Sequence, residues 1–264
     1  MVRPALACLL LAVLAVPLHA ADDRNPLAKA RQLYNMRDFA GAIQAADEAH
    51  RAPERADSAD LIAARALLER FRDSAQPADL AQARERLRRI APERFQSRER
   101  LEFIVGLGET LYFDGAPGAA AALFDGVLAS PDAADLDGRD TVLDWWASAV
   151  DHDARPRPDA ERQTVFLAMR TRMRDELGRR PTSATAAYWL VAAARGQGDL
   201  QGAWDAAMAA WARASLAPDH GAALRGDLDR LMQRAVIPER ARTPGQAVDA
   251  LREEWAQFKE KWNR

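Results

Sequence analysis

The chain has 264 residues, of which 48% are hydrophobic and 29% are charged, and its formal net charge is −2. This balance excludes an intrinsically disordered chain, because disorder requires low hydrophobicity together with high net charge. Basic and acidic residues are interleaved, so the basic stripe that is typical of a nucleic-acid-binding surface is missing, and we expect no nucleic-acid partner.

The first twenty residues are predicted to be a secretory signal peptide. Arg3 gives a positive start, an apolar run covers residues 5–16, and the small Ala20 precedes the charged pair Asp22-Asp23. This is the layout of a cleaved export signal. The run is shorter than the ~20 residues of a spanning helix, although an uncleaved anchor is the alternative. We therefore predict cleavage near Ala20, a periplasmic or secreted protein, and no integral membrane segment in its mature part.

Helical periodicity dominates the rest of the chain. From Pro26 onward apolar residues recur at helical spacing, and runs of alternating β-branched residues, which indicate strands, are missing. Prolines from Pro53 to Pro244, including Pro238, separate the periodic segments. The sequence therefore predicts an all-α fold.

A short phrase recurs along the chain: a turn residue, an aspartate, an aromatic residue or leucine, and then an alanine. It reads RDFAGA at 37–42, DLAQA at 79–83 and GDLQGA at 198–203, with a looser copy, GAPGAA, at 115–120. The turn residue tolerates the left-handed backbone that ends a helix. The aspartate then caps the next helix by accepting its free amides, and the alanine allows close helix packing. Each copy predicts a helical hairpin.

These hairpins resemble the tetratricopeptide repeat family. The copy at 104–131 fits best, through Leu107-Gly108, Leu111, Gly115, Ala120, Phe124 and Val127. The copy near 190–210 fits nearly as well, the copy at residue 79 is degenerate, and helices at 140–153 and 159–179 match poorly. The resemblance implies an α-α superhelix of about five hairpins over residues 21–219, closed by C-terminal capping helices over residues 220–264.

Two helices are expected after the last hairpin. One spans about His220 to Ala235, and the other opens at Thr243-Pro244, a capping threonine followed by proline in the first turn. The final helix carries an apolar stripe at spacings of four, three and four, made of Leu251, Trp255, Phe258 and Trp262. The stripe predicts a cap over the last apolar face of the array. The alternatives are a partner's groove, a membrane surface or another copy of this chain, so a homo-oligomer stays open.

Partner-binding residues follow from the resemblance, in which the first helix of each hairpin tends to line the inner surface. The candidates are Arg31, Tyr34, Glu109, Tyr112, Tyr188 and Arg195. The function this implies is an exported scaffold or adaptor that binds a protein or peptide in the cell envelope. A structural subunit that oligomerises through the tryptophan stripe of the final helix is an alternative.

Motifs for catalysis and metal binding are not found in the sequence. HExxH, a glycine-rich phosphate loop and a nucleophile elbow are missing. Asp135 and Asp137 suggest a calcium loop, but Ala133 and Asp144 occupy two positions where the EF-hand pattern needs ligands. We therefore predict no catalytic residue, no metal site and no cofactor. The alternative is an all-α envelope hydrolase or lyase that acts on cell wall or glycan with paired carboxylates.

Overall fold

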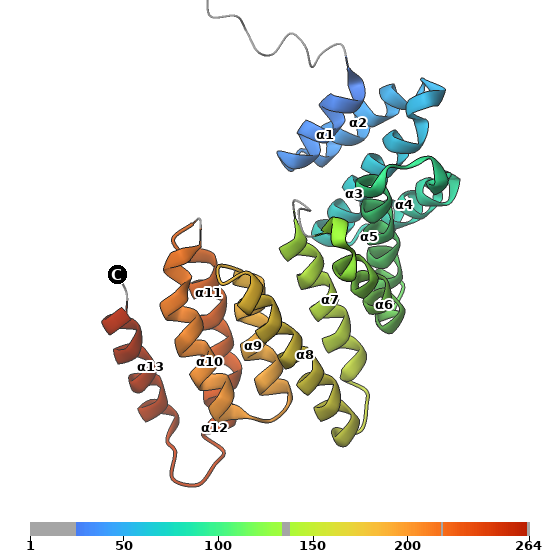
Figure 1. Cartoon of the computed structure of the whole chain (residues 1–264). Helices are drawn as coiled ribbons and strands as arrows, with labels where there is room; N and C mark the ends of the chain where they lie inside the picture. Colours follow the sequence, from blue (N-terminus) through green and yellow to red (C-terminus); the bar gives the residue numbers. More distant parts are fainter. Residues whose placement is uncertain (1–24, 134–137, 218, 263–264) are drawn as a thin grey trace, which may run out of the picture. The chain divides into compact units, whose positions relative to one another are not determined.

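The computed structural model describes residues 25–133, 138–217 and 219–262, and within these ranges every regular element is a helix. The predicted all-α fold is therefore confirmed, whereas the signal peptide lies outside the described residues. None of the described helices combines the length and apolarity needed to cross a membrane. The α-helices are α1 (Pro26–Asn35), α2 (Phe39–His50), α3 (Ala56–Ser74), α4 (Pro77–Arg89), α5 (Ser97–Phe113), α6 (Pro117–Ala129), α7 (Arg139–Ala154), α8 (Asp159–Arg179), α9 (Ala184–Gly196), α10 (Leu200–Arg213), α11 (Ala222–Leu231), α12 (Ile237–Arg240) and α13 (Val248–Trp262) (Figure 1).

The chain divides into two compact units, residues 1–82 and 83–264. In the first unit α1, α2 and α3 pack on one another around a core of alanines and Ile62. Alanine suits this position because its small side chain lets two helix backbones approach closely. The predicted boundary between a repeat array and its caps at residues 219–220 stays a prediction.

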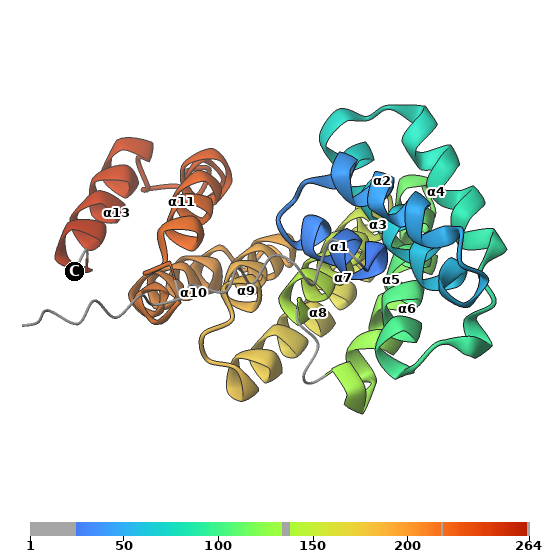
Figure 2. The same cartoon turned by 90° about the horizontal axis from the view of Figure 1, so that it is seen from above.

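The second unit is built around one apolar core that runs from α5 to α13. Neighbouring helices pack in chain order, and α9 also contacts α7 and α11 (Figures 1 and 2). Phe124 is fully buried against Gly108, where a Cβ atom would lie 2.6 Å from its ring. Only glycine leaves room for the ring at that position. The hairpin at residues 140–153 and 159–179, expected from weak signals, is present as α7 and α8.

Three hairpins share one turn geometry. A residue with positive φ follows the first helix: Arg37 at 62°, Gly115 at 78° and Gly198 at 83°. In each hairpin the next backbone N–H donates to the carbonyl five residues earlier, at 2.9 to 3.0 Å. This is the Schellman pattern, which satisfies the free carbonyl groups of a helix end. The prediction of left-handed turn residues is confirmed at all three positions.

The predicted aspartate caps are present in two of these hairpins. The carboxylate of Asp38 accepts the amide of Gly41 at 2.9 Å, and that of Asp199 accepts the amide of Gly202 at 2.8 Å. Each bond satisfies one of the free amides at the start of a helix. The turn after Gly115 has no such cap, because Ala116 has no side-chain acceptor.

The cap predicted for Asp79 is wrong. Helix α4 begins at Pro77, so Asp79 lies inside the first turn rather than before it. Proline is well suited to start a helix, since its φ is already helical and its missing N–H costs no hydrogen bond there. The buried carboxylate of Asp79 instead pairs with Arg70 of α3 at 2.9 Å.

The C-terminal helices differ from the prediction in two places. Helix α11, a π-helical turn at Met232–Val236 and α12 form a continuous run, so Pro238 lies inside a helix instead of between helices. A π-turn accommodates the local break that a proline causes in the α-helical hydrogen-bond ladder. Helix α13 begins at Val248 and not at Thr243, because Gly245, with a φ of 88°, makes a turn between them.

Candidate functional site

Two of the six candidate binding residues, Arg31 and Tyr34, lie on α1 in the first unit. Arg31 is exposed, whereas Tyr34 is half-buried in the core of that unit. The ring of Tyr34 packs on Phe39 with centroids 5.8 Å apart, and the guanidinium of Arg65 lies 4.8 Å from its centroid. Much of the Tyr34 ring surface therefore contacts its own unit.

Glu109 and Tyr112 lie one turn apart on α5 but differ in their surroundings. Glu109 is only 5% exposed, so its carboxylate belongs to the interior and does not line a surface. Tyr112 is half-buried, and its ring meets Trp145 edge to face with centroids 5.3 Å apart. Its ring also lies near the exposed His152, at 5.8 Å. Only Tyr112 of this pair reaches the surface.

Tyr188, on α9, lies at the centre of an aromatic and acidic surface. Its half-buried ring packs edge to face on Trp189, with centroids 5.5 Å apart. The indole N–H of Trp189 donates to Oδ1 of Asp144, on α7, at 2.7 Å. Burial raises the pKa of Tyr188, and the nearby carboxylates of Asp227, Asp144 and Asp151 raise it further, whereas the Arg195 guanidinium opposes them. We call Asp144, Asp151, Tyr188, Trp189 and Asp227 the Tyr188 face.

Arg195 lies about two helical turns after Tyr188 on α9, and its charge is already paired. Glu239 of α12 accepts hydrogen bonds from Nη2 at 2.6 Å and from Nε at 3.0 Å. These hydrogen bonds raise the pKa of Arg195, and the partial burial of the guanidinium opposes the shift. The sequence prediction included Arg195 but not Glu239, because no local pattern links residues 44 positions apart.

The charge around the Tyr188 face is negative. The face itself holds three carboxylates, and two of them pair with arginines: Asp151 with Arg155 and Asp227 with Arg230. Beside the face, Glu239 pairs with Arg195. Four carboxylates against three guanidinium groups leave one negative charge. Among the described residues, no arginine or lysine pairs with the exposed Asp144, which accepts the Trp189 indole. Half-buried aromatic rings beside an exposed carboxylate form a suitable site for a cationic side chain.

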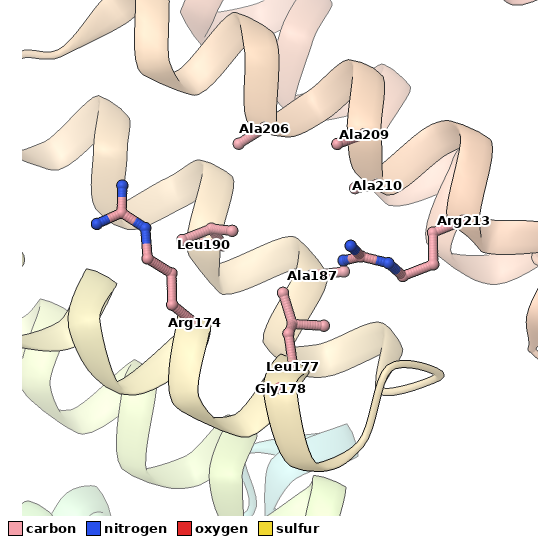
Figure 3. A pocket seen from close by; sticks show the side chains of 9 residues that line it. All are labelled: Arg174, Leu177, Gly178, Ala187, Leu190, Ala206, Ala209, Ala210 and Arg213. Atoms are coloured by element: carbon pink, nitrogen blue, oxygen red, sulfur yellow. The ribbon is translucent and has the colours of Figure 1, made fainter.

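A separate groove lies between α8 and α10, over α9 (Figure 3). Its volume is about 300 Å³. Figure 3 shows Arg174 at one end, Arg213 at the other, and Leu177, Ala187 and Leu190 between them. Gly178, Ala206, Ala209 and Ala210 complete the lining. Sequence reasoning did not find this groove, because alanines in a helix read as ordinary packing positions.

The stripe on α13 divides into a buried and an exposed part. Leu251 and Trp255 are buried, Phe258 is half-buried, and Trp262 is 48% exposed. The Trp255 ring packs on Trp204 and Trp211 of α10, with centroids 6.0 and 5.5 Å away. Leu251 and Trp255 therefore hold α13 against the core, and Trp262 faces solvent.

Two acidic segments carry side chains of the kinds that bind metal ions. Asp135 and Asp137 lie outside the described residues. Asp151 and Asp153, which flank His152, each form an ion pair with an arginine four residues later on the chain. Across the described parts of the chain, no group of three or more His, Cys, Asp or Glu side chains is placed to hold a metal ion.

Comparisons with known proteins give no match: no protein-family model matches the chain, and no curated protein or solved structure matches it. The function must therefore be inferred from the residues themselves. The strongest arrangement among them is the Tyr188 face. It combines a half-buried aromatic pair on α9 with carboxylates from two neighbouring helices, α7 and α11.

Proposed function

We propose that the protein is an exported helical-repeat scaffold that binds a protein segment in the cell envelope through the Tyr188 face. The observation that carries this proposal is the contact between Trp189 and Asp144, beside the Tyr188 ring. The indole is fixed in place by its hydrogen bond, so little side-chain entropy remains to be lost when a partner binds. A preorganised aromatic surface is the kind that dominates binding energy in protein interfaces.

The chemistry of the face favours a partner segment that contributes a lysine or arginine. A cation over an aromatic ring gains about 0.5–1 kcal/mol at an exposed site and about 2 kcal/mol when it is desolvated. The raised pKa of Tyr188, caused partly by three nearby carboxylates, indicates a negative potential at the ring. A cationic side chain would meet both attractions together, whereas an acidic segment would be repelled.

The recurring hairpin turn supports the scaffold part of the proposal. Three hairpins have the same left-handed turn, and two of them have the same aspartate cap. The turn at Gly115 is one of the positions that carry the tetratricopeptide resemblance. In that family the first helix of each hairpin faces the partner, and Tyr112, Tyr188 and Arg195 lie on the first helices α5 and α9.

Site-specific photocrosslinking tests the proposed binding face. A benzoylphenylalanine at Ser148, one helical turn after Asp144 on α7, should capture one protein in cells that produce this chain natively. The captured segment should contain lysine or arginine. The control position is Leu167, which is 49% exposed on α8. Identical adducts from both positions would exclude a specific face.

The same cells test the role of charge. Asp144→Asn keeps an acceptor for the Trp189 indole but removes the negative charge. We expect the adduct yield to fall about five-fold, the equivalent of about 1 kcal/mol. Asp175→Asn, at an exposed position on α8, is the matched control and should leave the yield unchanged. An unchanged yield with Asp144→Asn would show that the partner is not held by a cation.

Export is tested separately, by sequencing the N-terminus of the protein recovered from the envelope fraction. Cleavage near Ala20 places the new N-terminus at or within a residue or two of Ala21. An N-terminus at Met1 in membrane fractions would show an uncleaved anchor instead, and recovery from the cytosol would contradict export.

A further inference from the structure

The groove between α8 and α10 is open because the residues that line it are small. Gly178 on α8 faces Ala206, Ala209 and Ala210 on α10 across the groove (Figure 3). A Cβ atom added to Gly178 would have nothing within 4 Å. The space is therefore not needed for the packing of the two helices, and larger side chains would fit there.

The two arginines at its ends differ from their neighbours on the same helix. Arg170 and Arg172 of α8, and Arg180 directly after it, each form an ion pair with a carboxylate. Neither Arg174 nor Arg213 makes a hydrogen bond or an ion pair with any residue in the described ranges. Each guanidinium therefore has all of its donors available for a ligand.

We propose that this groove is a second docking surface, and that its occupant is a partner segment with apolar residues between two carboxylates. A volume of about 300 Å³ is at the small end of the range of ligand pockets, which suits a few side chains of a peptide. The leucine and alanine walls bury the apolar residues. Arg174 and Arg213 each pair with one carboxylate, in the two-bond geometry that guanidinium groups favour.

This docking surface is distinct from the Tyr188 face in position and in charge. It is formed by α8 and α10, the second helices of their hairpins, with α9 as its floor. Its free charges are positive, whereas the Tyr188 face is negative. The two surfaces therefore select segments of opposite charge, and failure of one proposal leaves the other intact.

The test is a random dodecapeptide display library, panned on the chain as it is purified from the producing cells. We expect enriched peptides with two Asp or Glu residues around an apolar centre. Their binding should weaken at least ten-fold in Arg174→Glu and in Arg213→Glu, and also in Ala209→Trp, which fills the groove from an exposed position on α10. Arg179→Glu, the same charge reversal at an exposed residue of α8 outside the groove, should retain full binding.

Several results would overturn the proposal. If no peptide is enriched, the groove has no specific ligand. The same follows if Arg179→Glu weakens peptide binding as much as Arg174→Glu and Arg213→Glu do. Enrichment of basic peptides whose binding requires Asp144 and is unchanged by Arg174→Glu would show binding at the Tyr188 face alone. A fall in molar mass of the purified protein on Arg213→Glu would show that another copy of this chain, not a partner, occupies the groove. Circular dichroism of each variant shows that it is folded before binding is compared.

Discussion

Glu239 holds the guanidinium of Arg195 through hydrogen bonds of 2.6 and 3.0 Å. The contact joins α12 to α9, and it gives a carboxylate partner to the guanidinium that opposes the raised pKa of Tyr188. Glu239 follows Pro238 on α12, directly after the π-turn at Met232–Val236. The helical run from α11 through the π-turn to α12 thus carries a carboxylate that affects the charge of a surface on α9.

The first prediction concerns Glu239→Gln. Loss of this carboxylate leaves Arg195 without a counter-charge, so the net charge of the Tyr188 face rises by one and a cationic partner binds less tightly. The pKa of Tyr188 should fall towards its ordinary value, because the Arg195 guanidinium acts on it uncompensated. Tyrosinate absorbance measured against pH follows this change, with Tyr188→Phe identifying the signal among the three tyrosines.

Stability should change little in the same variant. The pair is partly exposed, and such pairs contribute about 0.2–1 kcal/mol. Urea unfolding measures the difference. Glu260→Gln, an exposed position on α13, is the control for loss of one carboxylate. If the pKa of Tyr188 is unchanged by Glu239→Gln, Arg195 does not contribute to the potential of this face.

The second prediction concerns the cap of α10 and its dependence on pH. The amide of Gly202 first, and the guanidinium of Arg170 second, hold the pKa of the Asp199 carboxyl below its ordinary value. A depressed pKa contributes stability above the pKa of the unfolded chain, about 3.9, and this stability is lost as the pH falls through the folded value. Asp199→Asn keeps a cap acceptor but has no such dependence.

The difference in melting temperature between wild type and Asp199→Asn should therefore be constant above about pH 4 and should shrink below it. Asp199→Ala also removes the cap, which costs about 1 kcal/mol at any pH. Thermal unfolding followed by circular dichroism measures both. A difference between wild type and Asp199→Asn that grows as the pH falls would contradict the assigned sign.

The third prediction concerns the buried pair of Arg139 and Glu176, which links α7 to α8 at 2.7 Å. Glu176→Ala leaves the buried guanidinium without its counter-charge, and such a loss costs about 3–5 kcal/mol. Arg252→Ala breaks an exposed pair on α13 and should stay within about 0.5 kcal/mol. The double variant Arg139→Met/Glu176→Leu should recover most of the lost stability, since no charge is then buried alone. The free energies of unfolding are measured in urea. Equal losses of stability in Glu176→Ala and Arg252→Ala would refute the role assigned to the buried pair.

The fourth prediction separates capping from assembly on α13. The indole N–H of Trp255 donates to Asp229 of α11 at 2.8 Å, and its ring is fully buried. Trp255→Ala should therefore cost about 3–5 kcal/mol. Trp262→Ala should leave the unfolding free energy within about 0.5 kcal/mol, because this ring is largely outside the core. Light scattering of Trp262→Ala then shows whether the exposed ring joins copies of the chain: a lower mass than wild type would favour an assembly role.

The sequence by itself determined the helical class and the hairpin turns. Arg37, Gly115 and Gly198 could be identified as turn residues because a left-handed turn and its hydrogen bonds involve residues within one short segment. The caps at Asp38 and Asp199 are local for the same reason. At Asp79 the local rule failed, since a proline two residues earlier starts the helix and Arg70, on the preceding helix, pairs with the carboxylate.

Only the tertiary structure decided which residues from different helices are in contact. Trp189 meets Asp144, and Arg195 meets Glu239, across more than forty residues of chain. These contacts depend on the rotation of each helix about its axis and on its packing against neighbours, which helical periodicity does not specify. The same packing buried Glu109, a residue expected at the surface, and left a groove where small residues of α8 and α10 face each other. Local hydrogen bonding thus produced the hairpin turns and the helix caps, and side-chain packing between helices produced the candidate sites.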